Sequence, residues 1–127
     1  TLPAYGFYVR HVRNLDMRGI HLEYAEPELR PALVCDDVTH LNLSGLRAQI
    51  DPEAPAFISL HDVRHALING CAPLGPTGTF LSVEGDSRAI GVSGNDLTQT
   101  STAVRLGPGV PETAVKTGFN LDPQEQQ

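Results

Sequence analysis

Residues 38–46 read VTHLNLSGL, and the pattern of this segment occurs four times along the chain. In order, its nine positions hold an apolar residue, two variable residues, an apolar residue, a variable residue, an apolar residue, a variable residue, a glycine and one further residue. The copies are VRNLDMRGI at 12–20, VTHLNLSGL at 38–46, VRHALINGC at 63–71 and SRAIGVSGN at 87–95, of which only the last begins with a polar residue. Their glycines are 26, 25 and 24 residues apart, so the chain carries an internal repeat with a period near 25 residues.

Apolar residues alternate with variable residues before and after each of these glycines. The inward positions expected around Gly45 are Leu33, Cys35, Leu41, Leu43, Leu46 and Ala48. The same offsets hold in the other copies, provided that one residue is inserted in the fourth. Because a period of two indicates strands with one buried face, each repeat is expected to contain three short strands joined by turns of Gly, Pro, Asp and Asn.

Three short strands in each repeat predict an all-β fold, a right-handed, single-stranded parallel β-helix (a solenoid) of about four to five coils of ~25 residues. Like positions of successive repeats then stack at the strand spacing of ~4.8 Å. Residues 103–106 supply the first strand of a fifth coil. We therefore expect coils over residues 1–107 and a C-terminal tail or cap over residues 108–127.

The stacked columns assign roles to the cysteines and to one asparagine. Cys35 and Cys71 are the only cysteines, and both fall in inward columns, so we expect them to be small buried residues. Neither belongs to a Cys-x-x-Cys pair, so the sequence favours no zinc site. Asn95 completes the column of Cys71 and is expected to form hydrogen bonds along the stack near the end of the core.

Composition excludes several classes of partner. Fifteen acidic residues against nine scattered basic residues give a net charge of −6, which argues against nucleic-acid binding. No apolar run approaches the ~20 residues of a membrane span, so no membrane association is expected. The first residues lack both a methionine and the order of a signal peptide, which predicts a processed or excised segment. No cofactor is predicted.

Stacking is expected to gather charged side chains at the turn after the first strand of each coil. Its outer columns are Arg10, Asp36, His61 and His11, Asp37, Asp62, with Glu84 and Asp86 nearby. Side chains on neighbouring coils lie roughly 5–8 Å apart, which suits a carboxylate pair in glycoside hydrolysis. The candidate catalytic residues are Asp36, Asp37, His61 and Asp62. The candidate substrate-binding residues are Tyr8, Arg10, His11, Ser59, Asp86 and Arg105.

These residues also have a purely structural interpretation. Turns favour Asp for local reasons, and opposite charges on adjacent coils offset one another in a solvated turn. In a second turn column His40 and His65 stack above Asn14. Since no carboxylate or third histidine joins that column, no metal site is predicted there, and solvated turn residues are expected instead.

The segment YGFYVRHVRNLDMRGIHLEYAEPELRPALVCDDVTHLNLSGLRA, residues 5–48, resembles the C-terminal coils of pectin-lyase-like β-helix proteins. It is most similar to polygalacturonase-like members of glycoside hydrolase family 28, over about residues 5–107. That resemblance implies extracellular or periplasmic cleavage of pectic polysaccharides by inversion, using aspartates on the outward face of the first sheet and its following turn. Asp36-Asp37 matches the family's Asp-Asp motif, whereas its Asn-Thr-Asp, Gly-His-Gly and Arg-Ile-Lys motifs are absent.

Three functional hypotheses follow. The first is a partial β-helix domain of a carbohydrate-active, pectin-degrading protein, catalytically incomplete by itself and able to form homo-oligomers through its exposed ends. The second is a small complete hydrolase, a glycosidase or an esterase, that uses the Asp/His cluster. The third is a non-catalytic sugar-binding or oligomerising β-helix. In each carbohydrate-related case the expected partner is a polysaccharide or oligosaccharide.

Overall fold

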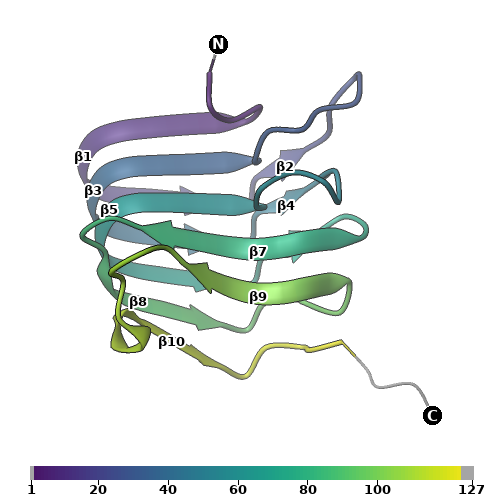
Figure 1. The fold of residues 1–127 in the computed structure, drawn as a ribbon. Coiled ribbons are helices and arrows are strands. Elements are labelled where there is room, and N and C mark those ends of the chain that lie inside the picture. Colours follow the sequence, from purple (N-terminus) through teal and green to yellow (C-terminus); the bar gives the residue numbers. More distant parts are fainter. Residues whose placement is uncertain (1, 124–127) are drawn as a thin grey trace.

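The computed structural model describes residues 2–123 and shows a parallel β-solenoid of about four turns (Figure 1). Each of the first three coils consists of one long strand, which bends midway, and one short strand. The long strands are β1 (Phe7–Arg18), β3 (Leu33–Ser44) and β5 (Ile58–Asn69), and the short ones are β2 (His21–Leu22), β4 (Arg47–Ala48) and β6 (Ala72–Pro73). In Figure 1 the long strands cross the front from right to left and return behind as the chain descends, so the coil is right-handed. The predicted β-helix is confirmed.

The last coils are assembled from shorter pieces. Their elements are β7 (Thr77–Glu84), β8 (Arg88–Ser93), β9 (Thr100–Leu106), the 3₁₀ helix η1 (Glu112–Ala114) and β10 (Val115–Gly118). β7 and β8 both pair with β5, since the inserted residue interrupts the long strand of this coil. The segment expected to form a tail or cap provides β10, which pairs with β8, while Val110 and Ala114 are buried against the core. No helix within residues 2–123 is long and apolar enough to cross a membrane.

The register of the long strands matches the predicted columns. Cys35, for example, pairs with Val9 on one side and Leu60 on the other. Cys35 and Cys71 are free and fully buried, as predicted. Burial raises the pKa of Cys35 to about 12, which keeps its sulfur in the unreactive thiol form.

The structure differs from the prediction at the bend of each long strand. The first two strands expected in each repeat are one continuous strand, because two residues in the left-handed backbone region turn the chain without ending its pairing. These residues are His11, Asn14, Asp37, His40, Asp62 and His65, with φ between 54° and 69°. Asn, Asp and His are the side chains that most readily adopt this conformation. The polar residues of the bends therefore have a backbone reason for their presence.

Ala89 occupies the equivalent of the His65 position in the fourth coil, with φ of 59°. We expect Ala89→Asn to raise the free energy of unfolding by about 0.5–1 kcal/mol, because Asn tolerates the left-handed region in which Ala is strained. Ala89→Val should lower it by about 1 kcal/mol or more, since β-branched residues are disfavoured there. Urea denaturation of both variants checks the order, and a Val variant as stable as the Asn variant would contradict it.

The N-terminal coil is covered on one side only. Its inward residues Val9, Leu15 and Ile20 are half-buried, whereas the residues that follow them in the same columns, Cys35, Leu41 and Leu46, are buried. The outer edge of β1 has no neighbour among the described strands, because β1 pairs with β3 alone. The second and third coils, whose long strands have a neighbour on each side, therefore bury their inward residues more completely.

Candidate functional site

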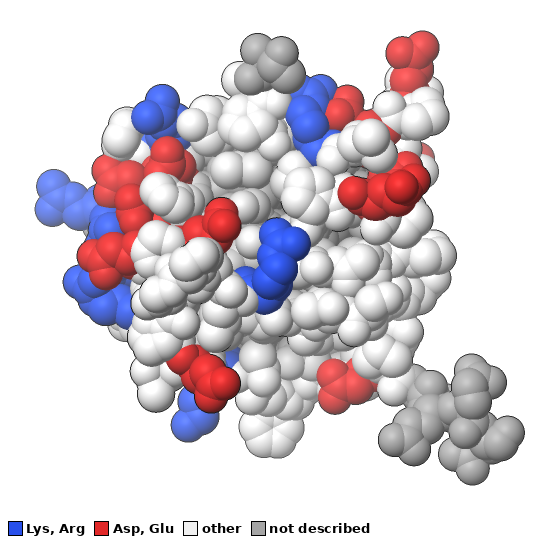
Figure 2. Space-filling view, in the orientation of Figure 1, with Lys and Arg blue, Asp and Glu red and all other residues white. Residues whose placement is uncertain are grey.

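The bends of the long strands gather the charged residues selected from the sequence. Figure 2 shows acidic and basic side chains interleaved at the edge of the molecule where the strands of Figure 1 turn. Arg10 pairs with Asp36, Asp36 with His61, and His61 with Glu84, so the predicted outer column is confirmed. We call the following six residues the first-turn cluster: Arg10, His11, Asp36, Asp37, His61 and Asp62.

His61 lies between two carboxylates of this cluster. Its Nδ1 is 3.0 Å from Oδ1 of Asp36 and 3.5 Å from Oδ2 of Asp62. The hydrogen bond to Asp36 is the main cause that raises the pKa of His61, and the charge of Asp62 adds to it. Nε of Arg10 is 3.5 Å from the other oxygen of Asp36. One donor atom each from Asp36, His61 and Asp62 lies within 4.8 Å of the others, so these three residues could hold a metal ion.

Asp37 is engaged by two basic side chains. Nδ1 of His11 lies 2.7 Å from its Oδ2, and Nη2 of Arg64 donates a hydrogen bond of 2.7 Å to its Oδ1. These two contacts, led by the one with His11, lower the pKa of Asp37. Arg64 also donates to Oγ1 of Thr39. Arg64 was not identified from the sequence, although it lies in an outward column with Thr39. Both carboxylate oxygens of Asp37 are thus in contact with a basic side chain.

Acid titration of Asp37→Asn tests this arrangement. The folded-state pKa of Asp37 lies below the ordinary value of an aspartate, so its contribution to stability is present above that ordinary value and is lost as the pH falls through the folded pKa. We therefore expect the urea midpoint of the variant to fall less than that of the wild type between about pH 5 and pH 2. A slope in Asp37→Asn that is as steep as that of the wild type, or steeper, would contradict the assignment.

The lengthened turn of the fourth coil, which contains the inserted residue, fixes the position of the Asp62 carboxylate. Gly85 adopts φ of 70°, which favours glycine, and a Cβ at this position would displace the carboxylate of Asp62 and the ring of His61. The next residue, Asp86, donates its backbone N–H to the same oxygen at 2.7 Å. The carboxylate of Asp86 forms a separate ion pair with Arg88 at 3.1 Å. Asp86 therefore orients Asp62 through its backbone.

The other candidate binding residues lie on the outward column of the first half-strands. The guanidinium of Arg10 is 5.8 Å from the ring centroid of Tyr8, which joins Tyr8 to the first-turn cluster. Ser59 pairs with Ser82 in the next coil, and Arg105 in the coil after that donates a hydrogen bond of 3.2 Å to Oγ of Ser82. The column is therefore continuous, but Arg105 stands two coils beyond Ser59 rather than beside the carboxylates.

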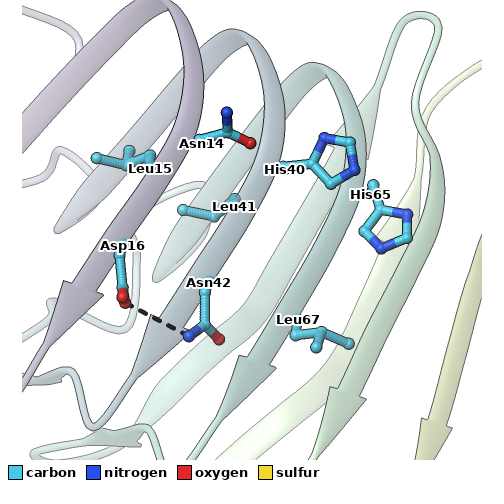
Figure 3. A pocket seen from close by; sticks show the side chains of 8 residues that line it. All are labelled: Asn14, Leu15, Asp16, His40, Leu41, Asn42, His65 and Leu67. Carbon is cyan, nitrogen blue, oxygen red and sulfur yellow. Dashed lines mark hydrogen bonds between the residues drawn. The ribbon is translucent and has the colours of Figure 1, made fainter.

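A groove lies on the outward side of the second half of the long strands (Figure 3). It has a volume of about 360 Å³, and we call it the outer groove. Its lining residues are Asn14, Leu15, Asp16, His40, Leu41, Asn42, His65 and Leu67. They come from β1, β3 and β5, so the groove spans three successive coils.

The outer groove combines polar and apolar groups in stacked columns. The rings of His40 and His65 have centroids 4.5 Å apart and planes tilted by 35°. Nδ2 of Asn42 donates a hydrogen bond of 3.4 Å to Oδ1 of Asp16, as the dashed line in Figure 3 shows. Leu67, next in that outward column, is 53% exposed. The sequence predicted the histidine column but not the groove, because alternation identifies outward positions without showing where the surface is concave.

No protein-family model, no curated protein and no solved structure matches this chain. The resemblance to polygalacturonase-like proteins therefore stays a prediction based on short sequence patterns. The strand pairing and the buried inward columns show the parallel β-solenoid independently of any relative. The first-turn cluster and the outer groove are the two surface features that bear on function.

Proposed function

We propose that this chain is the β-solenoid part of a carbohydrate-active protein and that it binds an extended oligosaccharide along its outer face. One observation carries the proposal, namely that the outer groove presents polar groups in columns over three coils. Like positions in neighbouring coils are ~4.8 Å apart along the solenoid axis. A polysaccharide presents hydroxyl groups at regular intervals, so a chain lying parallel to the axis could meet equivalent partners on each coil.

The side chains of the outer groove suit sugar hydroxyls. Asp16 offers acceptors, Asn42 offers both a donor and an acceptor, and each imidazole in its neutral form offers one of each. Leu67 supplies exposed apolar surface for the C–H face of a sugar ring. Because the groove lies open across the coils instead of enclosing a cavity, it favours a polymer that continues past it over a small ligand that is surrounded.

The first-turn cluster supports binding more than cleavage by this chain. A glycosidase needs a carboxylic acid with a raised pKa to protonate the leaving group. Asp37 has the opposite property, because His11 and Arg64 lower its pKa and occupy both of its oxygens. The motifs Asn-Thr-Asp, Gly-His-Gly and Arg-Ile-Lys are also absent. We therefore propose a domain that contributes binding surface to carbohydrate processing outside the cytoplasm, without complete catalytic machinery.

A small complete hydrolase is the second candidate, and His61 is the observation that favours it. The contact with Asp36 raises the pKa of His61, so the imidazole holds its proton to higher pH than usual and could act as a general acid. Asp62, whose Oδ2 approaches the same ring nitrogen at 3.5 Å, could then serve as the base. Ser59 and His61 are two residues apart on one strand and project from the same face, which also allows an esterase.

Binding can be tested by isothermal titration calorimetry with oligogalacturonates and rhamnogalacturonan fragments. We expect Asn42→Ala and Leu67→Ala each to weaken binding about tenfold, since each removes one contact worth roughly 1.4 kcal/mol. Arg47→Ala, an exposed change on the short strand β4 outside the groove, should leave the affinity unchanged. Affinity that is insensitive to both groove variants, or no binding to any saccharide, would overturn the proposal.

The same samples separate binding from hydrolysis. The pure chain is incubated with polygalacturonate, rhamnogalacturonan and a generic ester, beside Asp37→Asn and His61→Gln. The binding proposal predicts no release of reducing ends or acid by the wild type. Turnover that either substitution abolishes would establish the hydrolase instead.

A further inference from the structure

We propose that Asp36, His61 and Asp62 form a binding site for a divalent transition-metal ion of the Zn²⁺ class. The donors are Oδ1 of Asp36, Nδ1 of His61 and Oδ2 of Asp62, which belong to the bends of two neighbouring coils. This inference does not depend on saccharide binding at the outer groove, because none of the three residues lines it.

The distances among the donor atoms match those in a metal complex. Zn²⁺ forms bonds of ~2.0–2.1 Å to imidazole nitrogen and carboxylate oxygen, and in a tetrahedron such ligand atoms are ~3.3 Å apart. Nδ1 of His61 is 3.0 Å from the Asp36 oxygen and 3.5 Å from the Asp62 oxygen. One donor atom from each of the three residues lies within 4.8 Å of the others, so rotation of one carboxylate would complete one face of a tetrahedron.

Groups outside the triad orient both carboxylates. Oδ2 of Asp36 faces Nε of Arg10 at 3.5 Å, which leaves Oδ1 directed at His61. Oδ1 of Asp62 accepts the backbone N–H of Asp86 at 2.7 Å, which leaves Oδ2 directed at the same nitrogen. Each carboxylate thus has one oxygen held by an outer partner and one turned inward. Outer contacts of this kind fix the ligands of metal sites in proteins.

The donor set also selects the kind of ion. One imidazole nitrogen and two carboxylate oxygens suit Zn²⁺ and its neighbours in the first transition row, whereas Ca²⁺ and Mg²⁺ prefer oxygen ligands alone. Three protein ligands leave a fourth position for water or a ligand oxygen. That position is accessible, since the side chain of His61 is 52% exposed. Glu84, opposite His61 on the next coil, adds negative charge beside the site.

The stacked pair His40 and His65 is the strongest competing metal site, so the experiment needs a control variant for it. Its ring centroids are 4.5 Å apart, but Asn14 is the neighbour in that column, and within residues 2–123 no carboxylate joins the two histidines in a group of three possible ligands. Two imidazoles can bind Zn²⁺ weakly, so a signal from wild-type protein would not identify the site by itself. His40→Gln removes this alternative without touching the first-turn cluster.

The test is titration of the full chain with Zn²⁺ by calorimetry and with Co²⁺ by visible absorption, which reports tetrahedral coordination. We expect one ion per chain. Asp36→Asn, His61→Gln and Asp62→Asn should each weaken binding more than tenfold, and Arg10→Ala about tenfold, the loss typical of an outer partner. His40→Gln should bind with wild-type affinity.

Thermal melts keep the result interpretable if a substitution disturbs folding. A saturating Zn²⁺ concentration should raise the Tm of the wild type and of His40→Gln, but not that of His61→Gln, because only ligands of the native state stabilise it. The proposal is overturned if the wild type shows no saturable binding, if all three ligand variants bind as the wild type does, or if His40→Gln abolishes binding.

Discussion

Asn95→Ala is expected to lower the free energy of unfolding by about 3–5 kcal/mol, because it leaves several buried polar groups without partners. Asn95 is fully buried. Its Oδ1 accepts the backbone N–H of Cys71 at 2.9 Å, and its Nδ2 donates to the carbonyl oxygen of Ile68 at 3.1 Å. Each orphaned backbone group costs about 1–3 kcal/mol in an interior that water does not reach.

Asn120 extends this arrangement by one coil. Its Oδ1 accepts hydrogen bonds from the backbone N–H and from Nδ2 of Asn95, at 3.0 and 3.1 Å. Its Nδ2 donates to the carbonyl oxygen of Val92 at 3.1 Å, as that of Asn95 does to Ile68. The two amides therefore form a ladder along the solenoid axis. Asn120 is only partly buried, so Asn120→Ala should cost less, about 1–2 kcal/mol.

Urea denaturation followed by circular dichroism measures both effects. Asn42→Ala is the matched control, because Asn42 is a surface residue with one long hydrogen bond of 3.4 Å, and its loss should stay within about 0.5 kcal/mol. If Asn95→Ala cost less than about 1 kcal/mol, water would have to replace the amide, and the ladder would not be a main support of the core.

The sequence predicted the coils and this asparagine because both depend on stacking. Once the repeats are aligned, the column of each residue follows, and Asn95 falls among apolar inward neighbours. The polar start of the fourth repeat, Ser87, could not be interpreted in the same way. Its Oγ accepts the backbone N–H of Val63 at 3.0 Å and donates to the carbonyl oxygen of Glu84 at 2.8 Å. Ser87 thereby closes the turn that the inserted residue lengthens. The alternation of apolar and polar residues does not predict this role, because it depends on how the backbone turns.

The candidate site was predictable in position but not in chemistry. The outer column of Arg10, Asp36 and His61 follows from the repeat, and the structure pairs these residues as expected. The bends also require left-handed backbone at Asp37 and Asp62, and Asp meets that requirement with or without a function. Sequence patterns cannot separate the two causes. Which oxygen faces which nitrogen depends on side-chain geometry, and only the structure shows it.

The first residues of β5 show another limit of alternation. Ile58 points inward as predicted, so its neighbour Phe57 should face solvent, yet both are fully buried. The loop before β5 also contributes to the core, since its residues Ile50 and Ala54 belong to the same buried cluster as Phe57. The rings of Phe57 and Phe80 stack in this cluster, with centroids 5.6 Å apart and planes at 21°.

Phe57→Ala is accordingly expected to lower the free energy of unfolding by about 3–5 kcal/mol, the range for truncating a buried aromatic residue. Phe57→Leu should cost clearly less, because it keeps most of the buried volume. In a double-mutant cycle with Phe80→Ala, the ring pair should show a coupling of about 0.5–1.5 kcal/mol. Strictly additive losses would mean that the two rings contribute to stability independently of each other. A loss below about 1 kcal/mol for Phe57→Ala would contradict the tight packing of this part of the core.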